Sequence, residues 1–164
     1  MAQHVSEVAE TIANIIGSAK DDVVISSGRL DSRCYEKAGI IRAIKKAKAN
    51  EVSFSVVAGP KLDPATKNFV ALLKDNIFIS PNTPKFHFTV ADGKNFRFET
   101  RDIDDHDNST NMERWNDPVS GNYLRNKLLA SLPQTKPYTL VVKARDSKSR
   151  RTEKKGANAR SLFD

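Results

Sequence analysis

The first eighty residues alternate between stretches with helical spacing of apolar side chains and short runs rich in β-branched residues. Apolar residues three or four positions apart mark one face of a helix, whereas short apolar runs that end at glycine or proline mark buried strands. Asp63, followed by Pro64, is the expected N-cap of the third helix. The pattern predicts strands over 22–27, 52–57 and 76–80, and helices over 4–19, over 35–48 and around Phe69, Leu72 and Leu73.

The second half begins with two alternating segments, 85–91 and 96–99, which are joined by Asp92-Gly93. An Asp-Gly pair between alternating runs is a strong signal for a β-hairpin. The polar residues 101–117 are expected to form a surface loop. A last helix is expected around Leu124, Leu128, Leu129 and Leu132, followed by a short strand over 138–142.

This order of elements predicts an α/β fold with a mixed β-sheet flanked by helices on both faces. Residues 1–145 are expected to form one domain. From about Asp146 the chain is basic and poor in apolar groups, so residues 146–164 are expected to be a flexible, disordered basic tail.

The composition narrows the partners. The 164 residues hold 27 Lys and Arg against 20 Asp and Glu, a net charge of +7, which favours anionic partners such as nucleic acid. The single cysteine, Cys34, excludes an internal disulfide framework and fits a cytoplasmic location. No apolar run is long enough to span a bilayer, and residues 1–7 do not resemble a secretory signal, so no membrane insertion is expected.

The most informative chemistry lies on the strand over 85–91. Side chains alternate along a strand, so Lys85, His87 and Thr89 share one face while the aromatic residues face the core. A lysine beside a histidine is a good phosphate-binding pair. The alternative is an ordinary half-exposed strand with polar residues on its wet side.

The succession of segments from residue 20 to about 132, ending in Lys85-Phe-His-Phe-Thr-Val-Ala-Asp-Gly93, resembles one half of a phospholipase D superfamily domain. The signature of that family is His-x-Lys-x4-Asp, in which the histidine attacks phosphorus and the lysine holds the phosphate oxygens. Here the motif is degenerate, because Lys85 occupies the histidine position and His87 the lysine position, with Asp92 retained. The swap moves the imidazole by about 6–7 Å along the strand, which favours phosphate binding over nucleophilic catalysis.

Family members with a single motif form homodimers, so the resemblance implies a homodimer with two Lys85/His87 pairs at a shared groove. The expected function is nucleic-acid (phosphodiester) binding, with no cofactor and no metal. One alternative is a metal-independent phosphodiesterase or nuclease that uses His87, Lys85 and Asp92. Another is a non-catalytic interaction protein that docks through its C-terminal tail. DNA, RNA, a lipid head group and a nucleotide all remain open as ligands.

Four further groups carry weaker signals. Arg29 follows the first strand and is a candidate phosphate contact. The acidic run 102–107 offers oxygen ligands for a cation, but it lacks the glycine and glutamate of a calcium loop and is interpreted as a solvated loop. The residues Ser161, Leu162 and Phe163 resemble the end of a sliding-clamp docking motif. The cations of the tail that are expected to contact a phosphate backbone are Lys148, Arg150, Arg151, Lys154 and Lys155.

Overall fold

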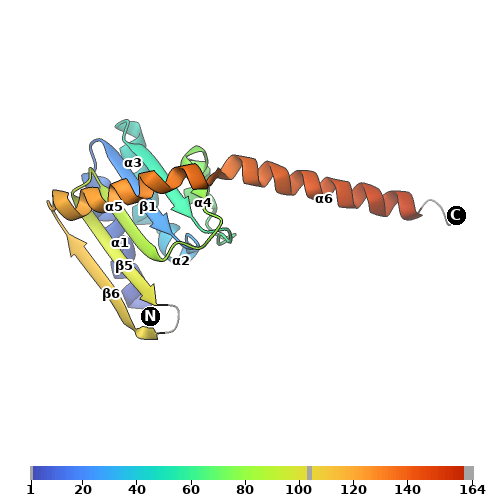
Figure 1. Ribbon diagram of the computed structural model, residues 1–164. Helices are drawn as coiled ribbons and strands as arrows, with labels where there is room; N and C mark the ends of the chain where they lie inside the picture. The colour runs from blue at the N-terminus through green and yellow to red at the C-terminus, as the bar shows by residue number, and fades with distance from the viewer. Residues whose placement is uncertain (1, 103–104, 161–164) are drawn as a thin grey trace.

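The computed structural model describes residues 2–102 and 105–160, and its centre is a seven-stranded mixed sheet with the order β6-β5-β4-β1-β2-β3-β7 (Figure 1). The three strands nearest the N-terminus pair in parallel, and every other pair is antiparallel. The strands are β1 (Asp22–Ser27), β2 (Ser53–Ala58), β3 (Ile77–Ile79), β4 (Phe86–Ala91), β5 (Asn95–Asp102), β6 (Asp105–Arg114) and β7 (Lys136–Pro137).

Helices cover both faces of the sheet, which confirms the predicted α/β class. One face carries α1 (Ala2–Ser18), α2 (Ser32–Tyr35), α3 (Ala38–Ala49) and α4 (Lys67–Leu73). The other face carries α5 (Pro118–Ser131). Short 3-10 turns span Lys74–Asn76 and Leu132–Gln134, and the chain continues into α6 (Tyr138–Arg160). No helix in the described part of the chain has the length and apolar character needed to cross a membrane.

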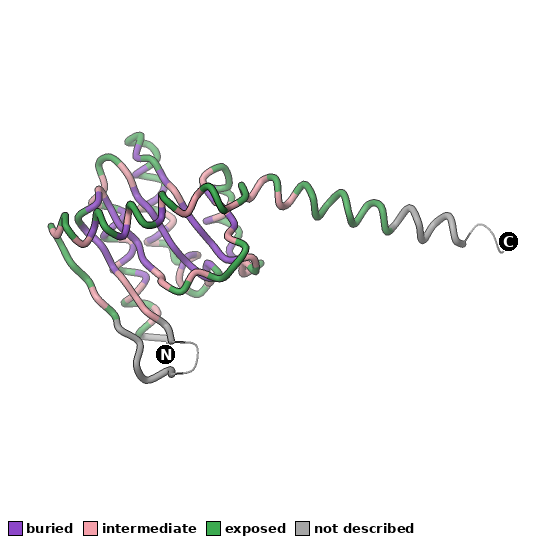
Figure 2. The backbone as a smooth tube through the Cα atoms, in the orientation of Figure 1, coloured by how far each residue is buried: buried purple, intermediate pink, exposed green. Residues whose placement is uncertain are grey.

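The alternation of apolar residues in the strands builds two separate cores. In β1, Val23 and Ile25 pack with the α1 side, whereas Val24 packs with α5. Figure 2 shows the buried backbone concentrated in the strands and the helix faces that meet them. Because both faces are covered, even polar residues in the middle of the sheet are buried.

The prediction of a surface loop over 101–117 is wrong. Most of this segment is β6, an edge strand that pairs with β5. The segment has few of the β-branched residues that mark a strand and is mostly polar or charged. An edge strand is held by backbone hydrogen bonds to one neighbour, so its side chains are free to be polar.

The expected strand over 138–142 is also wrong, since Tyr138 begins α6. Tyr138 and Val141, three residues apart, pack against the α1-side core. This spacing puts both side chains on one face of a helix, whereas in a strand they would point to opposite faces. The antiparallel partner of β3 is instead the two-residue β7. The segment expected to be a flexible tail continues α6 without a break as far as Arg160.

Two smaller expectations were wrong as well. The helix over 35–48 is divided into α2 and α3, with Tyr35 buried at the end of the first. Asp63 does not cap α4, which begins at Lys67 with Thr66 as its N-cap. The Asp63 carboxylate instead accepts from the backbone N–H groups of Ser32 and Ala65 at 2.8 and 2.9 Å.

Candidate functional site

The site is built on the carboxyl ends of β1 and β2, where two glycines meet. The N–H of Gly59 donates to the carbonyl oxygens of Ser27 and Gly28 at 3.3 and 3.0 Å. A Cβ on Gly59 would lie 2.5 Å from the Gly28 oxygen, so the close approach requires glycine. In open α/β sheets the crevice beyond the carboxyl ends of parallel strands is where ligands bind.

His87 lies at this edge because β4 runs antiparallel to β1, so β4 starts where β1 ends. The imidazole is half-buried against Gly28: a Cβ placed on Gly28 would lie 3.2 Å from His87 Cε1 and 3.1 Å from Thr83 Cγ2. The missing side chain at Gly28 therefore makes room for the ring. Lys85, two residues earlier, is exposed just outside the strand.

Sequence reasoning missed a buried ion pair next to His87. In the register of β4 and β5, His87 lies opposite Glu99 and Thr89 lies opposite Arg97. Both terminal nitrogens of Arg97 donate to Glu99 Oε2 at 3.3 Å, and the two side chains are only 6% and 14% exposed. The signal was present in residues 96–99, where phenylalanines alternate with the two charged residues.

The charged pair lies near α2, where two groups are kept in their neutral forms. Burial raises the pKa of the Cys34 thiol to about 11. Burial also raises the pKa of the Tyr35 hydroxyl, and a hydrogen bond with Ser27 opposes that shift. At neutral pH the thiol is therefore protonated and is a poor nucleophile.

Thr89 does not belong to an open surface, and the expectation that its face of the strand is wet was wrong. Its residue is 1% exposed because α1 packs across β4 and β5 on that side. A ligand at the strand ends therefore reaches Lys85 and His87 but not Thr89.

Asp92 lies at the opposite end of β4, about 16 Å from His87 at the usual rise per residue of a strand. Its carboxylate accepts from the backbone N–H groups of Lys20, Asp21 and Asp22 at 2.9, 2.8 and 3.1 Å. Asp92 and Gly93 have φ values of 53° and 64°, as the predicted hairpin turn requires. The structure thus does not bring Asp92 together with the other two residues of the motif.

Arg29 is exposed on a loop whose backbone is fixed. The N–H of Leu30 donates to Ser27 Oγ at 3.1 Å, and the N–H of Asp63 donates to the Arg29 carbonyl at 2.9 Å. The hydrogen bonds from Ser32 and Ala65 hold the pKa of the Asp63 carboxyl at about 2. Asp63 is therefore ionised at neutral pH, and its carboxylate keeps accepting these hydrogen bonds. Arg29 follows Gly28 directly and adds a cation to the edge that holds His87.

The remaining cations that the sequence singled out lie on α6. Lys148, Arg150 and Arg151 are exposed on the helix, and Lys154 and Lys155 lie further along it. Their helix begins near the strand ends, since a terminal nitrogen of Arg145 donates to the Pro60 carbonyl at 3.3 Å, one residue after Gly59. The suggested clamp-docking residues 161–163 lie outside the described residues.

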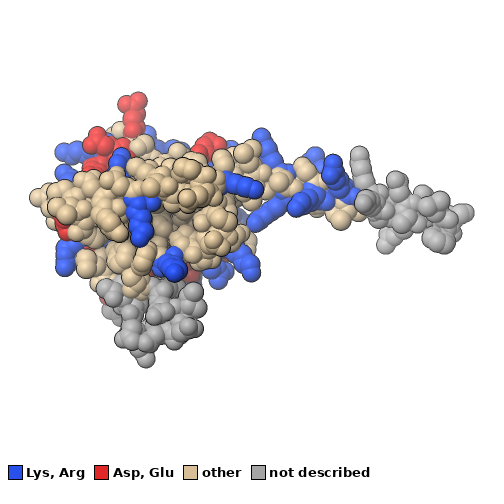
Figure 3. All heavy atoms as spheres, in the orientation of Figure 1, with Lys and Arg blue, Asp and Glu red and all other residues tan. Residues whose placement is uncertain are grey.

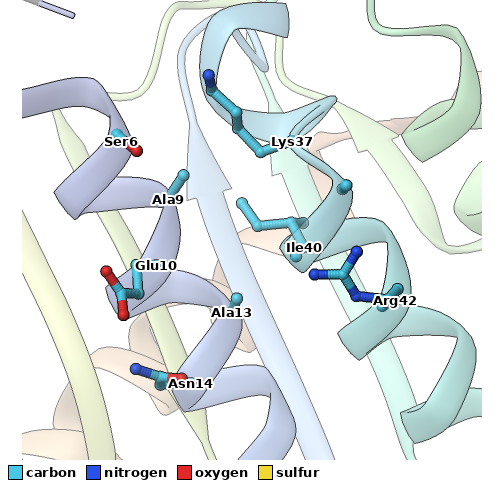
Figure 4. Close-up of a pocket in the computed structure, with 10 residues that line it drawn as sticks. Ser6, Ala9, Glu10, Ala13, Asn14, Lys37, Ile40 and Arg42 are labelled. Carbon is cyan, nitrogen blue, oxygen red and sulfur yellow. The ribbon is translucent and has the colours of Figure 1, made fainter. Parts of the chain in front are cut away.

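Other surfaces offer less chemistry. The described residues contain no group of three His, Cys, Asp or Glu side chains placed to hold a metal ion, and the side chains of the acidic run 102–107 lie outside the described ones. A groove of about 440 Å³ runs between α1 and α3, with Ala13 and Ile40 in its floor and Glu10 and Arg42 on its rims (Figure 4). It contains none of the site residues predicted from the sequence.

Two solved structures share the arrangement of the sheet and its helices. Nuc, a phospholipase D family member from Salmonella typhimurium, is 16% identical over 77% of this chain and 88% of Nuc, with a TM-score of 0.51. The chain has a phospholipase-D-like fold. TrmBL2, an archaeal chromatin protein whose structure shows a novel mode of DNA binding, is 11% identical over 79% of this chain, with a TM-score of 0.57. The matched part of TrmBL2 is 51% of its length.

No protein-family profile and no curated protein matches the sequence. At the identities of the two structural neighbours, the likeness establishes the phospholipase-D-like fold alone. Function therefore has to be argued from the strand-end site.

Proposed function

We propose that this chain binds nucleic acid through its phosphodiester groups, as a catalytically degenerate phospholipase-D-like homodimer. The observation that carries the proposal is the placement of His87 at the carboxyl ends of β1 and β2, with Lys85 exposed beside it. An imidazole and an ammonium group at such an edge form an anion site without any metal. Arg29 adds a third cationic group.

The net charge of +7 supports a polyanionic ligand over a single small phosphate. The two structural neighbours add support of a general kind, because one belongs to the phospholipase D family and the other binds DNA. The homodimer follows from the resemblance of the motif to single-motif members of that family. It would align two Lys85/His87 pairs along one phosphate backbone.

The swapped motif is the reason to expect binding without cleavage. In-line attack on phosphorus requires the imidazole nitrogen at one position, and a shift of two residues moves it by about 6–7 Å. The alternative, a metal-independent nuclease, draws support from the half-buried His87 ring and its position opposite Glu99, since a held imidazole is a better catalyst than a free one.

The test is a binding assay with labelled single- and double-stranded DNA and RNA at low salt in excess chelator. Wild type is compared with Lys85→Ala and His87→Ala, and with Lys45→Ala, which removes an exposed cation from α3. We expect binding without cleavage, weakened in the first two variants and unchanged in the third. Cleavage that His87→Ala abolishes would favour the nuclease, and equal binding by all four proteins would refute the site.

A further inference from the structure

Beyond Val142, α6 leaves the body of the protein. Tyr138 and Val141 pack against the α1-side core, and Arg145 donates to the Pro60 carbonyl. Every residue from 143 to 152 is exposed, and Figures 1 and 2 show the helix projecting away from the sheet. No described part of the body covers this segment.

The exposed segment is basic around most of its circumference. It carries five cations and a single acid, Asp146, and its other residues are small: Ala144, Ser147, Ser149 and Thr152. At 3.6 residues per turn, the five cations span roughly 220° of the helix. Figure 3 shows them as Lys and Arg atoms along the projecting helix. These cations are Lys143, Arg145, Lys148, Arg150 and Arg151.

The lack of large apolar and aromatic side chains in residues 143–152 excludes several kinds of binding partner for this segment. A coiled coil needs an apolar seam, and a helix that lies in a membrane surface needs an apolar face. A helix that binds in a protein groove needs apolar anchors at helical spacing. Residues 143–152 supply none of these, and they contain no aromatic ring on which the bases of a single strand would stack.

The class of partner that remains is a regular polyanion with a groove wide enough to receive a helix. An α-helix with its side chains is about 10–12 Å across, close to the roughly 12 Å width of the major groove of B-form DNA. The major groove of an A-form RNA duplex is too narrow for it. We propose that α6 from Lys143 onward is an arm that binds double-stranded DNA and is stabilised as a helix by the phosphates that it binds.

The second half of the proposal follows from the charges within the helix. Lys148 and Arg151 lie three residues apart and repel each other on one face. An exposed helix without packing is marginally stable on its own. Phosphates between the cations remove the repulsion, so DNA binding and helix formation strengthen each other.

The arm deepens the proposed function and rests on it for the choice of nucleic acid as ligand. The hydrogen bond between Arg145 and Pro60 roots α6 next to Gly59, at the edge that holds His87. One duplex bound at the strand ends can therefore continue along the arm.

The test uses the full chain and a labelled duplex DNA of about 30 base pairs, with its single strand and the matching RNA duplex as competitors. Lys148, Arg150 and Arg151 are replaced together by Gln. The matched control replaces Arg42, Lys45 and Lys46 of α3 by Gln, which changes the net charge equally. These residues are exposed, and Lys45 and Lys46 lie toward the end of α3 that leads into the start of β2, opposite Gly59.

We expect the α6 variant to bind the duplex on the order of ten- to a hundredfold more weakly. The slope of log K against log[salt] should fall by roughly 0.9 for each phosphate that the variant no longer neutralises. The α3 control should change affinity by less than about threefold, as expected from net charge alone. Equal reductions in the two triple variants would overturn the proposal, as would equal affinity for the single strand or the RNA duplex.

A second variant, Ser149→Pro, keeps every charge and breaks the exposed helix. We expect it to lose most of the affinity that the triple variant loses. The circular dichroism signal of helix should rise when duplex is added to wild type and not when it is added to Ser149→Pro. Wild-type affinity in Ser149→Pro would show that charge alone acts and would refute a helical arm.

The two proposals fail in distinguishable ways. If Lys85→Ala and His87→Ala weaken binding while the α6 variants do not, the arm is refuted and the strand-end site stands. If only the α6 variants weaken binding, the arm stands and the strand-end site is refuted. Binding to vesicles of phosphatidylserine as tight as binding to the duplex would refute DNA as the partner of the arm.

Discussion

The residues of one motif, Lys85, His87 and Asp92, lie at the two ends of β4 and differ in their surroundings. At one end the Asp92 carboxylate is surrounded by backbone N–H groups of Lys20, Asp21 and Asp22 and fixes the start of β1. At the other end His87 is half-buried and Lys85 is exposed, at the edge where β1 and β2 finish.

The difference shows that closeness within a motif does not place its residues in one site. A strand separates its ends by about 3.3 Å per residue, so residues five positions apart serve different edges of the sheet. We therefore assign Asp92 to the stability of the fold, whereas Lys85 and His87 are the residues proposed to bind the ligand.

The largest loss of stability is expected when the ion pair between Arg97 and Glu99, next to His87 in the sheet, is broken. Replacing Arg97 by Met removes one ion-pair partner of Glu99, leaves that largely buried carboxylate less well compensated, and should destabilise the fold by about 3–4 kcal/mol. The double variant Arg97→Met/Glu99→Met should recover most of this stability, because it replaces both members of the pair by apolar side chains of similar volume. Urea unfolding measures both. An equal cost in the single and double variants would contradict a structural ion pair.

Asp92→Ala should destabilise the protein by about 2–3 kcal/mol, because three backbone donors lose a charged acceptor and a residue with positive φ is replaced. The control is Asp75→Ala, an exposed carboxylate, which should change the stability by less than about 0.5 kcal/mol. Affinity for nucleic acid, measured at a temperature where the variant is folded, should stay within about twofold of wild type. A large reduction of affinity in folded Asp92→Ala would place the aspartate in the site.

Gly28→Ala should have a smaller effect on stability and a clear effect on binding. The new methyl group would crowd the His87 ring and the Thr83 methyl group at 3.2 and 3.1 Å, so the ring has to shift. We expect the stability to fall by about 1 kcal/mol and a labelled oligonucleotide to bind several-fold more weakly.

Gly17→Ala is the matched control, because nothing lies within 4 Å of a Cβ at that position. Gly17 is the penultimate residue of α1, so this substitution should change the stability by less than about 0.5 kcal/mol. Weaker binding in Gly17→Ala, or unchanged binding in Gly28→Ala, would contradict the prediction that Gly28 supports binding by making room for the His87 ring.

The smallest effect concerns the loop that carries Arg29. The folded pKa of Asp63, about 2, lies below the ordinary value of 3.8, so its ionised form contributes stability above about pH 4. That contribution is lost as the pH falls from about 4 through 2. The difference in unfolding free energy between wild type and Asp63→Asn should be constant above pH 4 and shrink below it. A difference that persists unchanged at pH 2 would show that hydrogen bonding to the anion is not its source.

The sequence was sufficient to predict the fold wherever period and turn chemistry agreed. Alternation over 85–91 and the Asp92-Gly93 pair predicted β4 and its hairpin, and both are present. The sequence failed where neighbours in space decide the outcome. Residues 105–114 form a strand because β5 offers a free edge, and Tyr138 starts a helix because of what it packs against.

The site was predictable in part, for the same reason. The face that Lys85 and His87 share follows from the period of a strand, but burial depends on which helices cover that face. Thr89 lies under α1, and its neighbour Arg97 is buried with Glu99. The pairing of β4 with β5 reveals this cluster only once the register is known.

The most direct test of the central claim observes the two ends of β4 in one experiment. The sequence contains only three histidines, so the ring signals of His87 can be assigned in an NMR spectrum with His87→Gln as reference. On titration with duplex DNA at low salt, the His87 ring signals should shift, and added salt should reverse the shift. The backbone amide signals of Lys20, Asp21 and Asp22 should stay in place. Shifts at Lys20–Asp22 without any at His87 would contradict the assignment of binding to the strand ends.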